Sequence, residues 1–401
     1  MSVITYYLEG PTDPGPRPVP VAVRLQASGE SVWIIEAQPK DESKLDLTLD
    51  NFWIGTDEVT VIFGDSGPSP WRSSDPLTAV IGRSRMVSQI AGSVGHHNEG
   101  RYLRAMSGRD SPQINRTEIR SGDTVGVVLE PNGGSDSFAV ILGGAIGGIP
   151  EPLARRVAAC GITAFALGYF GAPGLPSALV EIPLELPEAG IEFFRDRYTA
   201  GRHVGLVGTS KGAELALLLA SQLPDTIGPT VAIAPSRVAW YGVDMNDLSS
   251  MRRSSWTRGR APWPFLPLPE ARMPAFTDQG MRTDVCYDLS SYQADAVDAA
   301  RIPMEQARGP FLLLSGDDDH QWPAASMAGE LTQRMERNGR SSDVTSVVYP
   351  GAGHVFVMRE FLAPPGSPGS PPFDFGGDAE ADSKAAEDAW ARISALLTSP
   401  K

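Results

Sequence analysis

A serine, a run of aspartates and a histidine follow three apolar stretches, in an order that suits nucleophilic catalysis. Ser210 lies in Gly208-Thr209-Ser210-Lys211-Gly212, between an apolar run and a segment rich in alanine and leucine. A G-x-S-x-G turn is so tight that side chains at its flanking positions would clash, and it lifts the hydroxyl clear of a sheet at a helix N-terminus. The helix dipole there favours developing negative charge. The pattern therefore predicts Ser210 as a nucleophile.

A serine nucleophile needs a base, and the base needs an acid that orients it. GPFLLLSGDDD ends in Asp317, Asp318 and Asp319, and VVYPGAGH ends in His354, so each group follows a later strand-like run. The order serine, acid, histidine is that of α/β-hydrolases. The turn G-x-x-D favours Asp319 as the acid, with Asp318 as the alternative. His320 adjoins the acids, but His354 is the better base because it follows a strand of its own.

A glycine-rich stretch, LGGAIGG at 142–148, follows the first apolar run of this part of the chain. A dinucleotide-binding loop is disfavoured, because the spacing is not G-x-G-x-x-G and the run ITAFALGYF ends without an acid for the ribose. We instead expect an oxyanion hole, in which backbone N–H groups near Ala145 and at Lys211 hold a tetrahedral intermediate. No cofactor and no metal are expected, since no residues show metal-ligand spacing.

The pattern of apolar and polar residues in the segments that must position these groups changes along the chain. Up to about residue 130, short stretches alternate apolar and polar side chains between turn residues, which predicts an all-β sandwich over 1–132. Later runs are almost continuously apolar and alternate with helix-like segments, which predicts a doubly wound, mostly parallel α/β domain over 133–401. Residues 243–300 are interpreted as an insertion over the C-terminal edge of its sheet, and residues 363–378 as a loop.

Composition excludes several classes of protein. The chain has 401 residues and a formal charge of −14, which argues against a general nucleic-acid binder. No apolar stretch approaches the roughly 20 residues of a membrane span, and the N-terminus lacks the pattern of an export signal. We therefore expect a cytoplasmic protein, in which Cys160 and Cys286 are reduced packing residues.

Four separated stretches carry a resemblance to the acyl-CoA thioesterase and bile acid-CoA:amino acid N-acyltransferase family. They are GLVGTSKGAEL, IP leading to GPFLLLSGDDDHQW, YPGAGH, and GG leading to AEDAW near the end, within about 135–398. The resemblance implies an immunoglobulin-like β domain before a hydrolase domain, and a triad of Ser210, Asp319 and His354. It also implies hydrolysis of acyl-CoA or transfer of its acyl group to an amino acid. Residues 1–130 share only β texture with the family, and GGAIGG departs from its more glycine-rich loop.

The nucleophile and the local charge narrow the function. Amino-acid-transferring members of the family typically carry cysteine at the nucleophile position, so Ser210 favours a hydrolase that releases free acid and CoA. The alternatives are an acyltransferase, fed by CoA or an acyl carrier protein, that uses an amine or hydroxyl acceptor, and a non-catalytic binding protein. Residues 251–283 hold six arginines against two acidic residues. Arg252 and Arg253 are therefore candidates to bind CoA phosphates, with a solvated surface as the alternative.

Overall fold

The chain divides into two compact units. The computed structural model describes five strands within residues 2–82, and residues 114–399 apart from 245–246, 270–271, 273, 278 and 362–372. One unit comprises Met1–Ser111 with Glu360–Pro372, and the other comprises Pro112–Arg359 with Phe373–Lys401. Both Cys160 and Cys286 are free thiols, as predicted.

The described strands of the first unit form one five-stranded sheet in the order β1-β3-β2-β4-β5. β1 and β3 are parallel, and the other neighbours are antiparallel. The remainder of residues 1–113 lies outside the described residues, so an immunoglobulin-like sandwich stays a prediction. The strands are β1 (Ser2–Tyr7), β2 (Val19–Gln26), β3 (Ser31–Ala37), β4 (Glu58–Phe63) and β5 (Leu77–Gly82).

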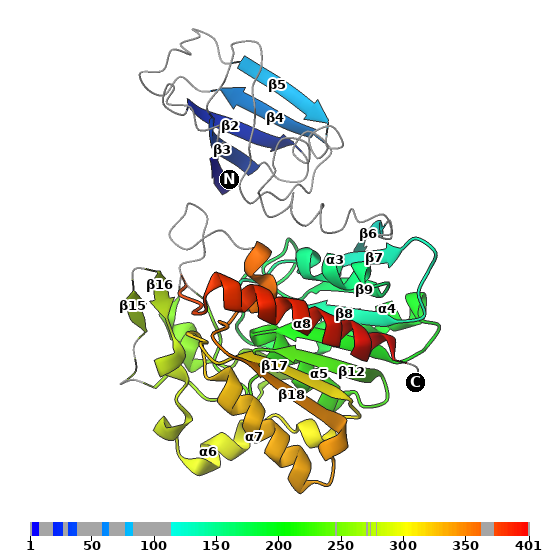
Figure 1. Cartoon of the computed structure of the whole chain (residues 1–401), viewed down its shortest axis with the longest axis vertical. Helices are drawn as coiled ribbons and strands as arrows, with labels where there is room; N and C mark the ends of the chain where they lie inside the picture. Colours follow the sequence, from blue (N-terminus) through cyan, green and yellow to red (C-terminus); the bar gives the residue numbers. More distant parts are fainter. Residues whose placement is uncertain are drawn as a thin grey trace. The chain divides into compact units, whose positions relative to one another are not determined.

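An eight-stranded sheet forms the centre of the second unit, in the order β18-β17-β12-β11-β8-β9-β7-β6 (Figure 1). Six neighbouring strands run parallel, and the hairpin β6–β7 joins the edge of β9 in antiparallel orientation. The strands are β6 (Ile114–Ser121), β7 (Thr124–Pro131), β8 (Phe138–Leu142), β9 (Thr163–Gly168), β11 (Val204–Thr209), β12 (Ile227–Ile233), β17 (Phe311–Gly316) and β18 (Val344–Tyr349). The carboxyl ends of the parallel strands meet at one edge, where α/β sheets bind their ligands.

The hairpin β6–β7 differs from the sequence-based expectation. Its residues fall within 1–132, assigned above to the β domain, yet they pair with the large sheet, and the second unit begins at Pro112. β6 alternates exposed and less exposed residues, a pattern that suits an edge strand in either kind of domain. β7 is almost fully buried, because helices cover both of its faces.

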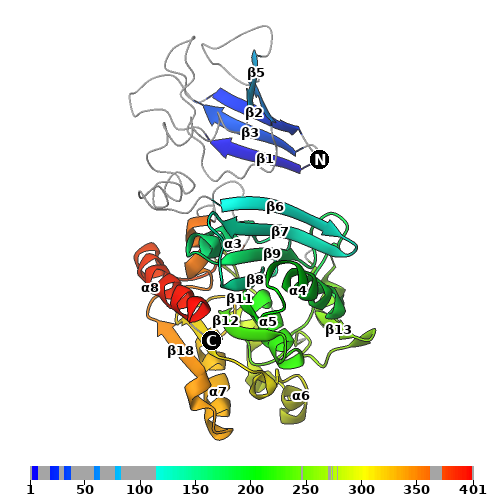
Figure 2. The same cartoon turned by 90° about the vertical axis from the view of Figure 1, so that its right-hand side faces the viewer.

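Helices cover the large sheet on both faces (Figure 2). α3 (Glu151–Ala159) and α8 (Ala379–Thr398) pack on one face, and α4 (Glu185–Tyr198), α5 (Lys211–Gln222) and α7 (Ala324–Arg337) pack on the other. This confirms the predicted α/β architecture with a mostly parallel sheet. None of the described helices is long and apolar enough to span a membrane.

The segment between β12 and β17 forms small elements over the carboxyl edge of the sheet. Trp240, Tyr241 and Tyr287 of this segment form an aromatic core with Trp322, from the loop after β17. β13 (Trp256–Arg258) pairs with both β10 (Ile182–Pro183) and β14 (Ala261–Pro262), while β15 (Ala275–Thr277) and β16 (Gly280–Arg282) form a hairpin. The short helices are η1 (Leu248–Arg252), η2 (Asp284–Tyr287), η3 (Leu289–Ser291), α6 (Ala294–Ala299) and η4 (Met304–Gln306), with η5 (Ser341–Asp343) and η6 (Phe356–Phe361) further along the chain.

Candidate active site

Ser210 occupies a strained turn between β11 and α5. Its φ of 55° and ψ of −121° lie in a region that side-chain-bearing residues rarely adopt. Two close approaches explain the flanking glycines: a Cβ at Gly208 would lie 2.1 Å from the Gly212 carbonyl oxygen, and one at Gly212 would lie 2.3 Å from the Leu142 oxygen. The turn also places Ser210 directly before the N-terminus of α5, as the sequence predicted.

A chain of hydrogen bonds joins Ser210 to His354 and Asp319. Ser210 Oγ lies 2.8 Å from His354 Nε2, and His354 Nδ1 lies 2.8 Å from Asp319 Oδ2. With Nδ1–H donating to the carboxylate, Nε2 is left to accept the serine proton. The side chains of His354 and Asp319 are only 4% and 3% exposed, so water does not compete for these bonds.

The three aspartates after β17 have different partners. Asp319 Oδ1 accepts from the N–H groups of Gln321 and Trp322 at 2.8 and 3.1 Å, which leaves Oδ2 for His354. Asp318 instead faces His320, and Asp317 accepts from the N–H of Gly351 at 2.6 Å. Of the acids left open by the sequence, Asp319 is therefore the one in contact with His354.

Aromatic rings and a buried acid surround His354. The Trp322 ring meets the imidazole edge-on at 5.7 Å, and the Phe375 ring stacks on it at 6.2 Å. Asp382, on α8, accepts from the N–H of Gly353 at 2.8 Å, and burial raises the pKa of this carboxyl. Sequence reasoning missed these three residues, because Phe375 and Asp382 lie outside the motifs and Trp322 reads as an ordinary core residue.

The glycine-rich stretch before Ala145 lies against Ser210, and Lys211 follows Ser210 directly. Gly144 lies against it, since a Cβ there would be 3.3 Å from Ser210 Cβ, and the Tyr169 hydroxyl donates to the Gly143 carbonyl at 2.5 Å. The N–H groups of Ala145 and Lys211 donate to no other backbone group within the described residues, apart from bonds internal to helices and strands. Lys211 is the first residue of α5, where an N–H has no intrahelical acceptor.

The side chain of Lys211 forms a buried ion pair that the sequence analysis did not anticipate. Lys211 Nζ lies 2.8 and 2.9 Å from the two carboxylate oxygens of Glu214, and the side chains are 2% and 0% exposed. Burial lowers the pKa of Lys211 and raises that of Glu214, while each opposite charge counters the other's shift. Glu214 also accepts from the indole N–H of Trp256 at 2.6 Å and from the N–H of Trp240. The spacing Lys-x-x-Glu was the available signal.

Carboxylates neutralise much of the positive charge of the arginine-rich stretch in the folded structure. Arg253 pairs with Glu181, Arg258 Nη1 lies 2.6 Å from Glu188, and two further arginines pair with nearby aspartates. The side chain of Arg253 remains half exposed. Arg252 is the last residue of η1 and directly precedes Arg253. Neither arginine takes part in the hydrogen bonds that join Ser210, His354 and Asp319.

The chain is similar to known proteins over most of its length. The family described as BAAT / Acyl-CoA thioester hydrolase C terminal matches residues 182–399. Acyl-coenzyme A thioesterase 6 of Mus musculus is 30% identical over 317 residues, which cover 75% of this chain and 69% of that protein. Acyl-coenzyme A amino acid N-acyltransferase 2 of Mus musculus is 28% identical over 294 residues, covering 70% and 64%. A solved esterase of Pyrococcus furiosus is 15% identical, covers 72% of this chain and 91% of its own, and gives a TM-score of 0.42.

Proposed function

Because the chain belongs to the BAAT / acyl-CoA thioester hydrolase family, we propose that it is a serine hydrolase that cleaves acyl-CoA to free acid and CoA. Both relatives named above act on acyl-coenzyme A according to their names, which supports this class of substrate. The observation that carries the serine mechanism is the continuous set of hydrogen bonds from Ser210 through His354 to Asp319.

Acylation begins with the attack of Ser210 Oγ on the thioester carbonyl carbon, while His354 Nε2 takes the hydroxyl proton. Asp319 holds the ring and stabilises the imidazolium that forms. The N–H groups of Lys211 and Ala145 stabilise the negative oxygen of the tetrahedral intermediate. The intermediate then expels the CoA sulfur, which receives the proton from His354 Nε2, and the acyl group remains on Ser210.

Deacylation repeats these steps with water as the nucleophile. His354 Nε2 takes a proton from water as its oxygen attacks the acyl carbonyl, and the same two N–H groups hold the second tetrahedral intermediate. When this intermediate collapses, Ser210 Oγ leaves with the proton from His354. The free acid departs, and the enzyme returns to its starting state.

An acyltransferase is the second candidate, supported by the likeness to the N-acyltransferase. An amine or hydroxyl would then replace water in the second half of the reaction. Serine at position 210 favours water, and a transferase would have to exclude water while it binds its acceptor. A carrier-protein thioester as substrate, a cytoplasmic location and an immunoglobulin-like sandwich in residues 1–111 are further proposals.

The test is turnover of a panel of acyl-CoAs, followed by free thiol and by mass spectrometry of the acyl product. Ser210→Ala should lower kcat by at least about 10⁴-fold while the unfolding temperature stays within a few degrees, since a small hydroxyl contributes little packing. Near-normal turnover by this variant would remove the nucleophile assignment. An amide formed at the expense of acid in the presence of glycine or taurine would establish the transferase instead.

A further inference from the structure

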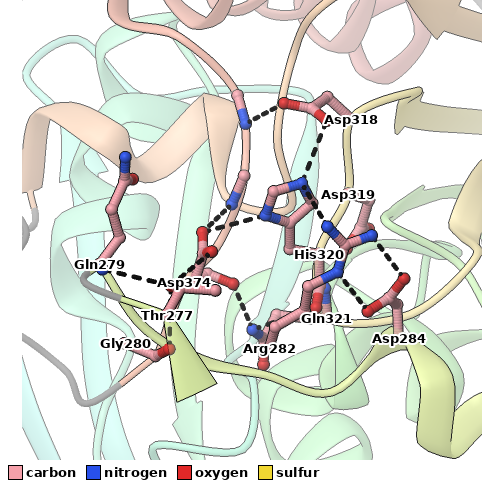
Figure 3. Close-up of polar contacts among 12 residues, drawn as sticks. Thr277, Gln279, Gly280, Arg282, Asp284, Asp318, Asp319, His320, Gln321 and Asp374 are labelled. Atoms are coloured by element: carbon pink, nitrogen blue, oxygen red, sulfur yellow. Dashed lines mark hydrogen bonds and ion pairs between the residues drawn. The ribbon is translucent and has the colours of Figure 1, made fainter. Parts of the chain in front are cut away.

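A second polar cluster lies beside the acid and base but outside the hydrogen bonds that join them. Figure 3 shows His320 between the carboxylates of Asp318 and Asp374, with Arg282 next to its ring. His320 Nδ1 lies 3.1 Å from Asp374 Oδ1, and Nε2 lies 3.1 Å from Asp318 Oδ1 and 3.3 Å from Arg282 Nη1. Arg282 also pairs with Asp284 at 2.7 Å.

This cluster joins three segments that are distant in sequence. His320 belongs to the loop after β17, Arg282 ends the β15–β16 hairpin, and Asp374 belongs to residues 373–377, which we call the strap. Asp374 Oδ2 accepts from the Thr277 hydroxyl at 3.0 Å, and Oδ1 accepts from the N–H of Gly376 at 3.0 Å. The Asp374 carboxylate therefore fixes both the hairpin and the turn of the strap.

The strap also contacts both partners of Ser210. The N–H of His354 donates to the Phe375 carbonyl at 2.8 Å, and the Phe375 ring stacks on the imidazole. Gly376 forms a bridge with Asp319. A shift of the strap would therefore move the base and the acid together.

The chemistry of the His320 ring identifies its constant contact. When the ring is neutral with hydrogen on Nδ1, that N–H faces Asp374 and Nε2 can accept from Arg282. When both nitrogens carry hydrogen, the ring faces Asp374 and Asp318 as donors to both. The contact of 3.1 Å between Nδ1 and Asp374 Oδ1 faces the ring in either form. Nδ1 is buried and makes no hydrogen bond of standard geometry, so we call this contact the link.

We propose that His320 is a positioning residue, which holds the strap through Asp374 and so keeps His354 and Asp319 aligned for reaction at Ser210. This inference rests on the proposed function for the identity of the reaction. A misplacement of reacting groups by about 1 Å can slow a reaction by about 10²-fold. Loss of the link should therefore lower kcat by about 10- to 100-fold and leave the KM for acyl-CoA unchanged, since His320 is assigned no contact with substrate.

Two amide variants separate positioning from a general structural role. His320→Asn places an NH2 group on Cγ, where histidine has Nδ1, and should keep kcat within about threefold of the wild type. His320→Gln reaches toward the site of Nε2 and should lose as much as His320→Ala. Asp374→Asn should lose at least as much as His320→Ala, because this carboxylate also accepts from Thr277 and Gly376. The double variant His320→Ala/Asp374→Asn should be no slower than Asp374→Asn alone, because the link between the two residues is then already lost. His203→Asn and His203→Gln are matched controls: His203 contacts Arg308 at 3.0 Å and precedes β11 at the opposite edge of the sheet.

Each variant is assayed by acyl-CoA turnover, by the rate at which a fluorophosphonate labels Ser210, and by thermal unfolding. Labelling needs an activated serine but no thioester. If the wild type is labelled but cleaves no acyl-CoA, the proposed function is wrong. The labelling rates of the variants then still test the inference about His320. Unchanged kcat and labelling in His320→Ala would overturn it. So would equal losses in the Asn and Gln variants, a change in KM alone, or equal losses in the His203 controls. A wild-type Ser210 that resists labelling would overturn both proposals.

Discussion

The two sides of the site are supported by different means. Behind Ser210, Lys211 and Glu214 form an ion pair with side chains only 2% and 0% exposed. Glu214 also accepts from Trp240 and Trp256, which lie between β12 and β17. Beside the acid and base, the side chains of His320 and Asp318 remain 21% and 51% exposed, so water reaches both. Charges are costly to bury without partners and cheap to leave in water.

This difference predicts which property each side controls. Breaking the dry pair leaves one charge without hydration or a partner, so the protein should lose stability. Breaking the partly hydrated cluster leaves charges that water can solvate, so the protein should keep its stability and lose alignment of His354 and Asp319. The variants below test the comparison, from the largest expected effect to the smallest.

Asp319→Asn should cause the largest loss, on the order of 10⁴-fold in kcat, because the amide cannot hold His354 in its reactive tautomer. Asp318→Asn alters the partly exposed cluster and the bond from the Gly377 N–H, but not the contact with His354, and should cost less than about tenfold. The rate of thiol release at saturating acyl-CoA measures kcat for both variants. A greater loss of kcat in Asp318→Asn than in Asp319→Asn would show that Asp318 is the acid that acts on His354. It would also contradict the proposed difference between the two sides of the site.

Glu214→Gln should lower the free energy of unfolding by about 3–5 kcal/mol, since it leaves the Lys211 ammonium buried without its counter-charge. Glu188→Gln is the matched control, because it breaks the more exposed Arg258 pair and should cost about 1 kcal/mol or less. Lys211→Met/Glu214→Gln should be more stable than Glu214→Gln alone. Denaturant titration measures the free energy of unfolding of all three variants. Equal losses for Glu214→Gln and Glu188→Gln would contradict a special cost for breaking the buried pair behind Ser210.

The smallest effect concerns Arg253 and its partner Glu181. If Arg253 binds CoA phosphate, Arg253→Gln should raise the KM for acyl-CoA about two- to fivefold, and Glu181→Gln, which releases the arginine, should lower it. Neither should change the KM for a short acyl thioester that lacks the nucleotide. Steady-state kinetics with both substrates measure this, and a Glu181→Gln that raises KM for both would count against phosphate binding.

The nucleophile side was the more predictable from sequence, for a local reason. The G-x-S-x-G turn and the strand before it are contiguous, so the placement of Ser210 follows from neighbouring residues. Asp319 and His354 required only that successive parallel strands end at one edge of a sheet. The ambiguity between Asp318 and Asp319 depended on which carboxylate the amides of Gln321 and Trp322 engage, which composition does not reveal.

Features that depend on distant partners were not predictable. The arginine-rich stretch is positive in sequence, but Glu181 and Glu188, near and on α4, compensate part of its charge in space. The composition of 363–378 predicted only a loop, although Asp374 and Phe375 contact the hairpin and His354. The hairpin β6–β7 resembled a β-domain segment because antiparallel edge strands alternate in either setting.

The distance along the chain between Ser210 and His354 sets the order in which the site can form during synthesis. The two residues are 144 positions apart. At about 5–20 residues per second, a ribosome adds His354 roughly seven to thirty seconds after Ser210. During that interval the serine turn can fold, but it has no base, because Asp319 is added 35 residues before His354 and the base comes last of the three. The strap follows later still. The nascent chain therefore carries an unreactive serine until nearly all of the catalytic unit has been made.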